Sequence, residues 1–127
     1  MKIIAHDPNS SNKGHYSPGV ISHGMLYISG QLPINPETGK IQEGDISAQT
    51  QRTLLNVERI LNAAGLNKEN VVQCRIYIPD MKFWDTINDI YSGFFGTHKP
   101  ARVIVPSREL HNEALVEIEA IAELEAE

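Results

Sequence analysis

The most regular pattern of hydrophobic and polar residues lies in the middle of the chain and predicts a long amphipathic helix. Between Ile46 and Ala64, apolar or small side chains recur every three or four residues, which places them on one helical face. Asp45 directly before this segment can serve as the N-cap, and Gly65 directly after it stands where a glycine commonly ends a helix. The spacing therefore predicts a helix bounded by Asp45 and Gly65.

A second amphipathic helix is predicted closer to the C-terminus. Asp80 follows a proline and can cap the start of a helix, and Gly96 can end it. Between them lies an apolar stripe at helical spacing, made of Phe83, Ile87, Ile90 and Phe94. This face is expected to pack against the core.

Five segments rich in β-branched and aromatic residues predict the strands that accompany these helices. They span residues 2–5, 20–32, 71–78, 101–105 and 115–122. The longest of them reads as two strands joined at His23 and Gly24, since glycine tolerates a positive φ. In the last segment apolar residues alternate with glutamates, so one face of that strand is expected to be buried.

The predicted order of elements is β-β-β-α-β-α-β-β, with both helices laid on one sheet. This alternation of strands and helices indicates an α+β or α/β fold. Two helices are enough to cover only one face of such a sheet. Association with further copies of the chain is the simplest cover for the other face.

Composition and charge fit one small domain and narrow the possible ligands. The 127 residues are 41% hydrophobic and contain no repeat or linker, so a single domain spanning residues 1–127 is expected. The formal net charge is −5 and the basic residues are scattered along the chain. This charge distribution disfavours binding to nucleic acid or to an anionic membrane surface.

Cysteine content and the N-terminus indicate a cytoplasmic protein. The one cysteine, Cys74, excludes an intrachain disulfide and fits a reducing compartment. The first residues lack the apolar core of a signal peptide, and no apolar run approaches the roughly 20 residues of a membrane span. The five histidines are dispersed without CxxC or HxxxH spacing, and no G-x-S-x-G motif is present. Neither a metal site nor a serine nucleophile is indicated.

Several separated motifs of the chain together resemble one protein family. In chain order they are Gly14-His15-Tyr16-Ser17-Pro18-Gly19-Val20, Leu26-Tyr27-Ile28-Ser29-Gly30-Gln31-Leu32-Pro33, Gly44-Asp45-Ile46-x-Ala48-Gln49-Thr50, Asn88-x-x-Tyr91-x-x-Phe94-Phe95, Pro100-Ala101-Arg102 and Val116-Glu117-Ile118-Glu119-Ala120-Ile121-Ala122. In the same order they resemble the motifs of the RidA family, also called YjgF, the reactive-intermediate deaminases, some of which are labelled endoribonuclease L-PSP. The similarity covers nearly the whole chain, which makes it more specific than any single motif.

The resemblance implies a fold, an assembly and a reaction. The fold would be a chorismate-mutase-like α+β subunit with a mixed sheet and two helices on one face, assembled as a homotrimer with one cleft at each subunit interface. The reaction would be hydrolysis of 2-aminoacrylate-type enamines and 2-imino acids to 2-keto acids and ammonia, without a cofactor or metal. The order of strands and helices is compatible with this fold but does not by itself select it.

The resemblance also assigns the two main roles in such a site. Arg102 stands at the position of the family's substrate-binding arginine, a role that suits a guanidinium because its planar fork pairs bidentately with a carboxylate. Without the surrounding motifs, Arg102 would read as a surface arginine in a salt bridge. Glu117 aligns with the acid of the family's cleft, where it would position water or relay protons. Glu119 has the same parity on its strand, so spacing alone does not choose between the two acids.

Four further positions are expected to line the cleft by the same resemblance. Tyr16 would act as a third catalytic residue that hydrogen-bonds the substrate or a water, and is otherwise a partly buried structural tyrosine. Ser29 and Gly30 would allow close approach of the ligand, although Gly30 also fits a strand bulge. Asn88 would bind substrate from the second helix, and is otherwise a solvated helix residue.

The chain departs from the family pattern just after the arginine. Many members carry a cysteine where this chain has Ile104, which can offer the substrate its backbone N–H but no thiol. Residues 106–111 also differ from the family's usual V-x-x-L-P pattern, which leaves the preference for a substrate side chain open. Cys74 is no replacement, since it lies in a predicted strand and is expected to be a small core residue.

Two other functions remain open at this point. A non-enzymatic trimer that senses small carboxylates through the same cleft would need Arg102 but not Glu117. An endoribonuclease fits the chain poorly, because the acidic charge, the lack of a basic groove and the lack of a histidine acid/base pair all argue against it.

Overall fold

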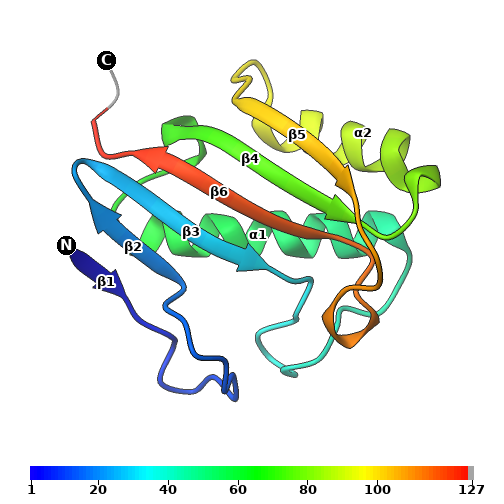
Figure 1. The fold of residues 1–127 in the computed structure, drawn as a ribbon, viewed down its shortest axis with the longest axis horizontal. Coiled ribbons are helices and arrows are strands. Elements are labelled where there is room, and N and C mark those ends of the chain that lie inside the picture. Colours follow the sequence, from blue (N-terminus) through cyan, green and yellow to red (C-terminus); the bar gives the residue numbers. More distant parts are fainter. Residues whose placement is uncertain (126–127) are drawn as a thin grey trace.

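Six strands form one mixed sheet on which two α-helices lie in the computed structural model, which describes residues 1–125 (Figure 1). The strands are β1 (Lys2–Ile4), β2 (Gly19–Ser22), β3 (Met25–Gln31), β4 (Val71–Ile78), β5 (Ala101–Pro106) and β6 (Glu117–Glu123). The helices are α1 (Ile46–Ala63) and α2 (Trp84–Phe95), with three short 3-10 turns, η1 (Lys68–Asn70), η2 (Met81–Phe83) and η3 (His111–Glu113). The predicted order of strands and α-helices and the α+β class are confirmed.

The strands do not lie in the sheet in the order in which they occur along the chain. Across the sheet the order is β1-β2-β3-β6-β4-β5, so the last strand lies in the middle. All neighbours are antiparallel except β4 and β5, which run parallel because the chain crosses between them through α2. This crossover leaves β5 on the edge of the sheet with α2 beside it.

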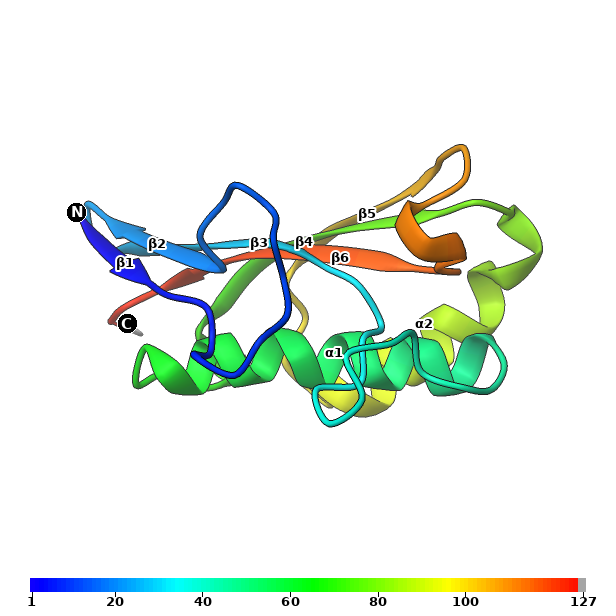
Figure 2. The same ribbon diagram turned by 90° about the horizontal axis from the view of Figure 1, so that it is seen from below.

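Both helices cover the same face of the sheet, as Figure 2 shows in side view. The alternation along β6 explains which side chains they meet, since Ile118 and Ala120 are buried while Glu117 and Glu119 lie on the opposite face. The core between sheet and helices also includes Leu26, Ile28, Leu54, Val57, Leu61, Cys74, Ile76, Ile78, Ile87 and Tyr91. No helix in the described part of the chain is long and apolar enough to cross a membrane.

The face of the sheet without helices carries exposed apolar side chains. Tyr27 is 47% exposed, Val103 is 44% exposed and Ile3 is 49% exposed. Ile3 and Tyr27 are aligned across this face by strand pairing, since Ile3 pairs with Val20 and Val20 with Tyr27. Exposed apolar surface of this kind is typical of protein interfaces. The trimer itself stays a prediction.

The local sequence signals act as predicted at the ends of the elements. The Asp45 carboxylate accepts a hydrogen bond of 3.1 Å from the backbone N–H of Ala48, and Gly65 has a positive φ of 77° just beyond α1. In the turn between β2 and β3, His23 and Gly24 have positive φ values of 53° and 76°. Two consecutive positive φ values match the twist of a tight hairpin.

Two predicted boundaries are displaced, each by a side-chain hydrogen bond. The Asp80 carboxylate accepts a bond of 2.9 Å from the backbone N–H of Lys82, so it caps η2, and α2 begins only at Trp84. The backbone N–H of Leu115 donates a bond of 2.9 Å to the Gln49 side chain. The strand β6 therefore begins at Glu117 rather than at Leu115.

Candidate active site

Arg102 lies on the edge strand β5, on the face that the helices cover. Its Cα partner on β4 is Cys74, which is buried beneath α2. Paired residues in neighbouring strands project to the same face of a sheet. The Arg102 side chain therefore extends into the angle between β5 and α2, where it is partly exposed.

The guanidinium of Arg102 is held by three uncharged side chains of α2. Its Nη1 donates a hydrogen bond of 2.9 Å to Oδ1 of Asn88. The guanidinium carbon lies 4.9 Å from the ring centre of Tyr91 and 5.6 Å from that of Trp84, within the range of cation–π attraction. Within residues 1–125 no carboxylate forms an ion pair with this arginine. Its positive charge is fixed in place without being neutralised.

Beneath the guanidinium, the Tyr91 ring continues into the core. Tyr91 is only 6% exposed, and its hydroxyl makes no well-formed hydrogen bond among the described residues. Its polar neighbour is the thiol of Cys74, whose pKa burial raises to about 11. Burial likewise raises the pKa of the Tyr91 hydroxyl. Both groups are therefore neutral at physiological pH, and neither offsets the charge of Arg102.

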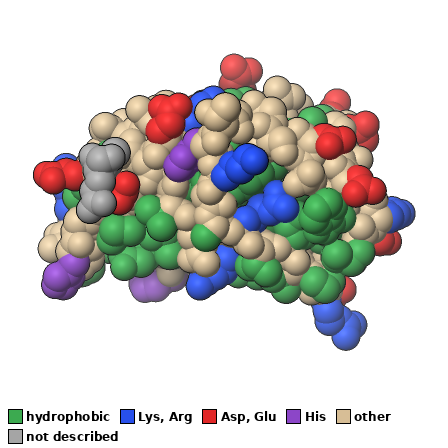
Figure 3. Space-filling model, turned by 90° about the horizontal axis from the view of Figure 1, so that it is seen from above, with side chains coloured by type: hydrophobic (Ala, Val, Ile, Leu, Met, Phe, Trp, Pro, Cys, Tyr) green, Lys and Arg blue, Asp and Glu red, His purple; other side chains and the backbone are tan. Residues whose placement is uncertain are grey.

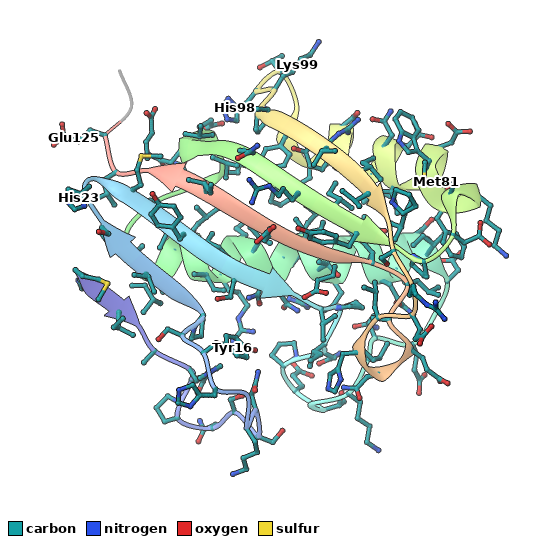
Figure 4. The ribbon with its side chains drawn as sticks, in the orientation of Figure 1. Tyr16, His23, Met81, His98, Lys99 and Glu125 are labelled. Carbon is teal, nitrogen blue, oxygen red and sulfur yellow. The ribbon has the colours of Figure 1, made fainter. Side chains whose placement is uncertain are left out.

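A groove of about 440 Å³ opens beside this arginine, between α2 and the start of β5. Its lining consists of Asn88, Tyr91, Ser92, Phe95, Gly96, His98, Lys99, Pro100 and Arg102. Two of these residues are basic and none is acidic, although the chain as a whole carries a net charge of −5. Figure 4 shows His98 and Lys99 at the turn that leads into β5. Seen from that edge of the sheet, Lys and Arg side chains gather near the middle and acidic ones toward the rim (Figure 3).

A second group of predicted site residues surrounds Glu117 on the open face of the sheet. The Glu117 side chain lies so close to Gly30 that any Cβ at that position would collide with its carboxylate. The pairing of β3 with β6 also shifts register between Ile28 and Gln31. The strand irregularity expected at Gly30 is thus present, and the neighbour that a Cβ there would meet is the Glu117 carboxylate. The close approach of a ligand to Gly30 stays a prediction.

The two glutamates of β6 have different surroundings. Glu119 accepts a hydrogen bond of 2.6 Å from the Tyr77 hydroxyl and lies 3.6 Å from Nη1 of Arg75. Glu117 has no such partner within residues 1–125, and burial raises the pKa of its carboxyl, with the negative charge of Glu119 adding to the shift and His111 opposing it. The side chain suited to exchange a proton is therefore Glu117.

Ser29 on β3 is tied by a hydrogen bond to the loop that precedes β2, and this loop carries Tyr16. The Ser29 hydroxyl donates a bond of 2.7 Å to the backbone oxygen of Ser17. Tyr16, the next residue back, is 44% exposed, and its backbone oxygen is bonded by the His6 ring. Figure 4 shows Tyr16 in the loop that precedes β2. The hydroxyl of Ser29 fastens this loop, whereas the Tyr16 ring remains accessible.

One subunit does not bring the predicted site residues into one place. Arg102 and Asn88 lie at the edge of the sheet on the helix face, and Ile104 follows them on β5, where its side chain packs against the core. Glu117 lies two strands away, on the opposite face of the sheet. Arg102 pairs with Cys74 on β4, and Cys74 pairs with Ala120 on β6. Glu117 is three residues along β6 from Ala120. With strand spacing and rise per residue this is a separation of roughly 14 Å between the two Cα atoms. A small substrate cannot contact both groups in the same subunit.

The sequence did not predict a role for the two aromatic residues of α2 that contact the Arg102 guanidinium, Trp84 and Tyr91. No role is predicted for Trp84, and Tyr91 is predicted only as part of the motif of the second helix. The signal was nevertheless present, since Trp84, Asn88 and Tyr91 are spaced four and three residues apart and so share one helical face.

Comparison with known proteins identifies relatives over nearly the full chain. The family model described as Endoribonuclease L-PSP matches residues 7–124. A RutC family protein of Pyrococcus horikoshii is 43% identical, over 96% of this chain and 98% of its own. A protein of Salmonella typhimurium named 2-iminobutanoate/2-iminopropanoate deaminase is 38% identical, over 95% and 96%.

Solved structures of related proteins have the same fold as this chain. The crystal structure of TdcF from Escherichia coli with bound serine superimposes with a TM-score of 0.89 and 36% identity, covering 97% of this chain and 98% of that one. The sequence comparison and the structural comparison thus identify the same family over nearly the whole chain. The chain belongs to the Endoribonuclease L-PSP family, which includes the RidA and YjgF proteins that its motifs resemble.

Proposed function

We propose that this protein hydrolyses reactive 2-imino acids and their enamine tautomers, of the 2-aminoacrylate type, to 2-keto acids and ammonia. The observation that carries the proposal is Arg102, a fixed guanidinium that has no carboxylate partner among residues 1–125 and lines a groove without acidic residues. Such a group binds a small carboxylate bidentately. The deaminase name of the Salmonella relative supports this substrate class.

We further propose that the active form is a homotrimer with its clefts between subunits. In each cleft Arg102 and Asn88 of one subunit would face Glu117, Gly30, Ser29 and Tyr16 of the partner subunit. Two features support this arrangement: the roughly 14 Å separation of the two groups within one subunit, and the uncovered apolar face of the sheet. The edge strand β5 lies where one subunit can meet the next.

The proposed reaction uses each group for one task. Arg102 holds the substrate carboxylate, so that the adjacent C=N carbon faces a water beside Glu117. Glu117 takes a proton from this water as its oxygen adds to the carbon, and then gives a proton to the nitrogen. The hydroxyl of this intermediate then passes its proton through Glu117 to the nitrogen as the C–N bond breaks, so that ammonia leaves and the hydroxyl oxygen becomes the keto oxygen. The raised pKa of Glu117 suits a group that must both accept and donate a proton.

Two alternatives compete with this proposal. A trimer that only binds small carboxylates is favoured by the neighbour TdcF, whose structure holds serine, a stable amino acid rather than an imine. RNA cleavage is suggested by the family description, but the net charge of −5 offers no broad basic surface to a phosphate backbone. We therefore propose small imino and keto acids, and not nucleic acid, as ligands, and no cofactor in the reaction.

The test is direct. A PLP-dependent serine dehydratase generates 2-aminoacrylate, and the release of pyruvate is followed with and without this protein. Acceleration by the wild type, lost in Arg102→Ala and in Glu117→Gln, is the expected result. Acceleration that survives Arg102→Ala would contradict the proposal. If Glu117→Gln binds pyruvate normally and the wild type gives no acceleration, the protein is a carboxylate-binding one.

A further inference from the structure

Three side chains on one face of α2 converge on the guanidinium of Arg102. Trp84, Asn88 and Tyr91 follow one another at intervals of about one helical turn, and each contacts the arginine. We propose that they are positioning residues, which fix the guanidinium in the orientation that binds the substrate carboxylate. This inference rests on the proposed function, because it assigns a task to residues around the same arginine.

The contacts restrain the guanidinium in complementary ways. An arginine on an edge strand has many rotamers, most of which point into solvent. The aromatic rings of Trp84 and Tyr91 attract the charge itself and restrict the direction of the side chain. The hydrogen bond from Nη1 to Asn88 then fixes the rotation of the guanidinium within its own plane. The other N–H groups remain available for a carboxylate.

The three side chains that contact Arg102 are uncharged, and this is as important for binding an anionic substrate as their geometry. An aspartate or glutamate in the place of Asn88 would hold the arginine more strongly, but it would also occupy the guanidinium and cancel its charge. An amide accepts one hydrogen bond and leaves the charge intact. Trp84, Asn88 and Tyr91 thus order the Arg102 side chain without competing with an anionic substrate.

For Tyr91 the ring, and not the hydroxyl, is the part that acts. The hydroxyl is buried next to Cys74 without a well-formed hydrogen bond within residues 1–125. The ring is fixed from behind by Phe95, with 4.7 Å between ring centres, and presents its face to the guanidinium. Removal of the hydroxyl should therefore leave the position of Arg102 unchanged, whereas removal of the ring should not.

The experiment measures binding and turnover separately in the full-length protein. Pyruvate binding is followed by NMR titration, and KM and kcat are measured with enzymatically generated 2-aminoacrylate. Asn88→Leu and Tyr91→Leu should each weaken pyruvate binding and raise KM by roughly ten-fold. Tyr91→Phe should stay within about two-fold of the wild type, since the aromatic face is retained. Trp84→Leu should have a smaller effect than Tyr91→Leu, because its ring lies farther from the charge.

Asn88→Asp separates a positioning role from a merely structural one. The new carboxylate would hold Arg102 in place but compete with the substrate, so KM should rise more than in Asn88→Leu and should recover as the pH falls and the carboxylate is protonated. Phe94→Leu removes a half-buried aromatic ring from the same helix outside the groove, and serves as the control for loss of packing.

Three results would contradict the positioning role of these residues. The inference is overturned if folded Tyr91→Leu binds pyruvate like the wild type, if Tyr91→Phe is as impaired as Tyr91→Leu, or if Phe94→Leu weakens binding equally. If the wild type binds pyruvate through Arg102 but hydrolyses no imine, the proposed reaction fails while the positioning role, measured by pyruvate binding, stands.

Discussion

The Tyr77 hydroxyl donates a hydrogen bond of 2.6 Å to Oε1 of Glu119, and this bond gives the two glutamates on β6 different surroundings. The two acids lie on the same strand and face, but Glu119 is engaged by Tyr77 and Arg75. The Glu117 side chain lies beside Gly30 and forms no ion pair or hydrogen bond among the described residues. The acid that has no fixed partner is the one available to a water molecule.

The stability of the protein should depend on pH through Glu117. Its pKa in the folded state is raised above the ordinary value of 4.5, first by burial and then by Glu119. The folded state therefore holds this proton more tightly than the unfolded state, and the stabilisation present below pH 4.5 is lost as the pH rises through the raised pKa. Relative to Glu117→Gln, the wild type should lose free energy of unfolding over this window. Denaturant titrations at a fixed protein concentration measure the difference, and parallel pH profiles would contradict it.

Gly30→Ala should disrupt the site around Glu117. The added Cβ would collide with the carboxylate at the flexible end of the Glu117 side chain, so the carboxylate must move. We therefore expect a large fall in kcat and little change in the free energy of unfolding. Gly93→Ala is the matched control, because a Cβ at Gly93 on α2 meets nothing within 4 Å. That change should stabilise the helix by roughly 0.5–1 kcal/mol and leave the activity intact. Equal effects of the two substitutions would count against the close approach of Gly30 and Glu117.

Arg102 should not be replaceable by lysine. Lysine keeps the charge but loses the planar fork and the hydrogen bond to Asn88. We expect kcat/KM to fall roughly 100-fold in Arg102→Ala and roughly ten-fold in Arg102→Lys, since a charged hydrogen bond contributes about 1.5–3 kcal/mol. Steady-state kinetics on 2-aminoacrylate give the ratio. Full activity in Arg102→Lys would show that charge alone is sufficient.

Tyr91→Phe should be neutral or stabilising. The Tyr91 hydroxyl is buried without a well-formed hydrogen bond among residues 1–125, and an unsatisfied buried polar group costs about 1–3 kcal/mol. Thermal unfolding of the variant should therefore occur at the same temperature as in the wild type or at a higher one. A clear drop in Tm would mean that the hydroxyl contributes a bond to the core, through Cys74.

Mixed trimers should recover activity that neither parent has. If each cleft takes Arg102 from one subunit and Glu117 from the next, co-expression of the Arg102→Ala and Glu117→Gln chains creates some clefts with both residues intact. Random assembly of equal amounts should make about a quarter of the clefts complete. Activity near this level, in oligomers shown to be mixed by native mass spectrometry, is the expected result. Inactive mixed oligomers would contradict this arrangement, because they would show that Arg102 of one subunit and Glu117 of another do not form a common active site.

The sequence by itself determined the elements and several of their ends. The caps at Asp45 and Gly65 and the positive-φ turn at His23 and Gly24 act within a few residues of the chain, through backbone hydrogen bonds and local φ preference. For this reason the order of strands and α-helices could be predicted from the pattern alone. The displaced starts of α2 and β6 arose where a side chain bonded a backbone N–H, in one case from a residue distant in sequence.

Only the tertiary structure decided which of these residues lie together. Glu117 and Glu119 have the same parity, and the choice between them depends on Tyr77 and Arg75, which are brought alongside by the pairing of β4 with β6. The spacing of Trp84, Asn88 and Tyr91 was visible in the sequence, but their common target was not, because Arg102 reaches them only through the parallel crossover from β4 to β5. Strand pairing is selected by the burial of whole faces, and no local pattern carries that information.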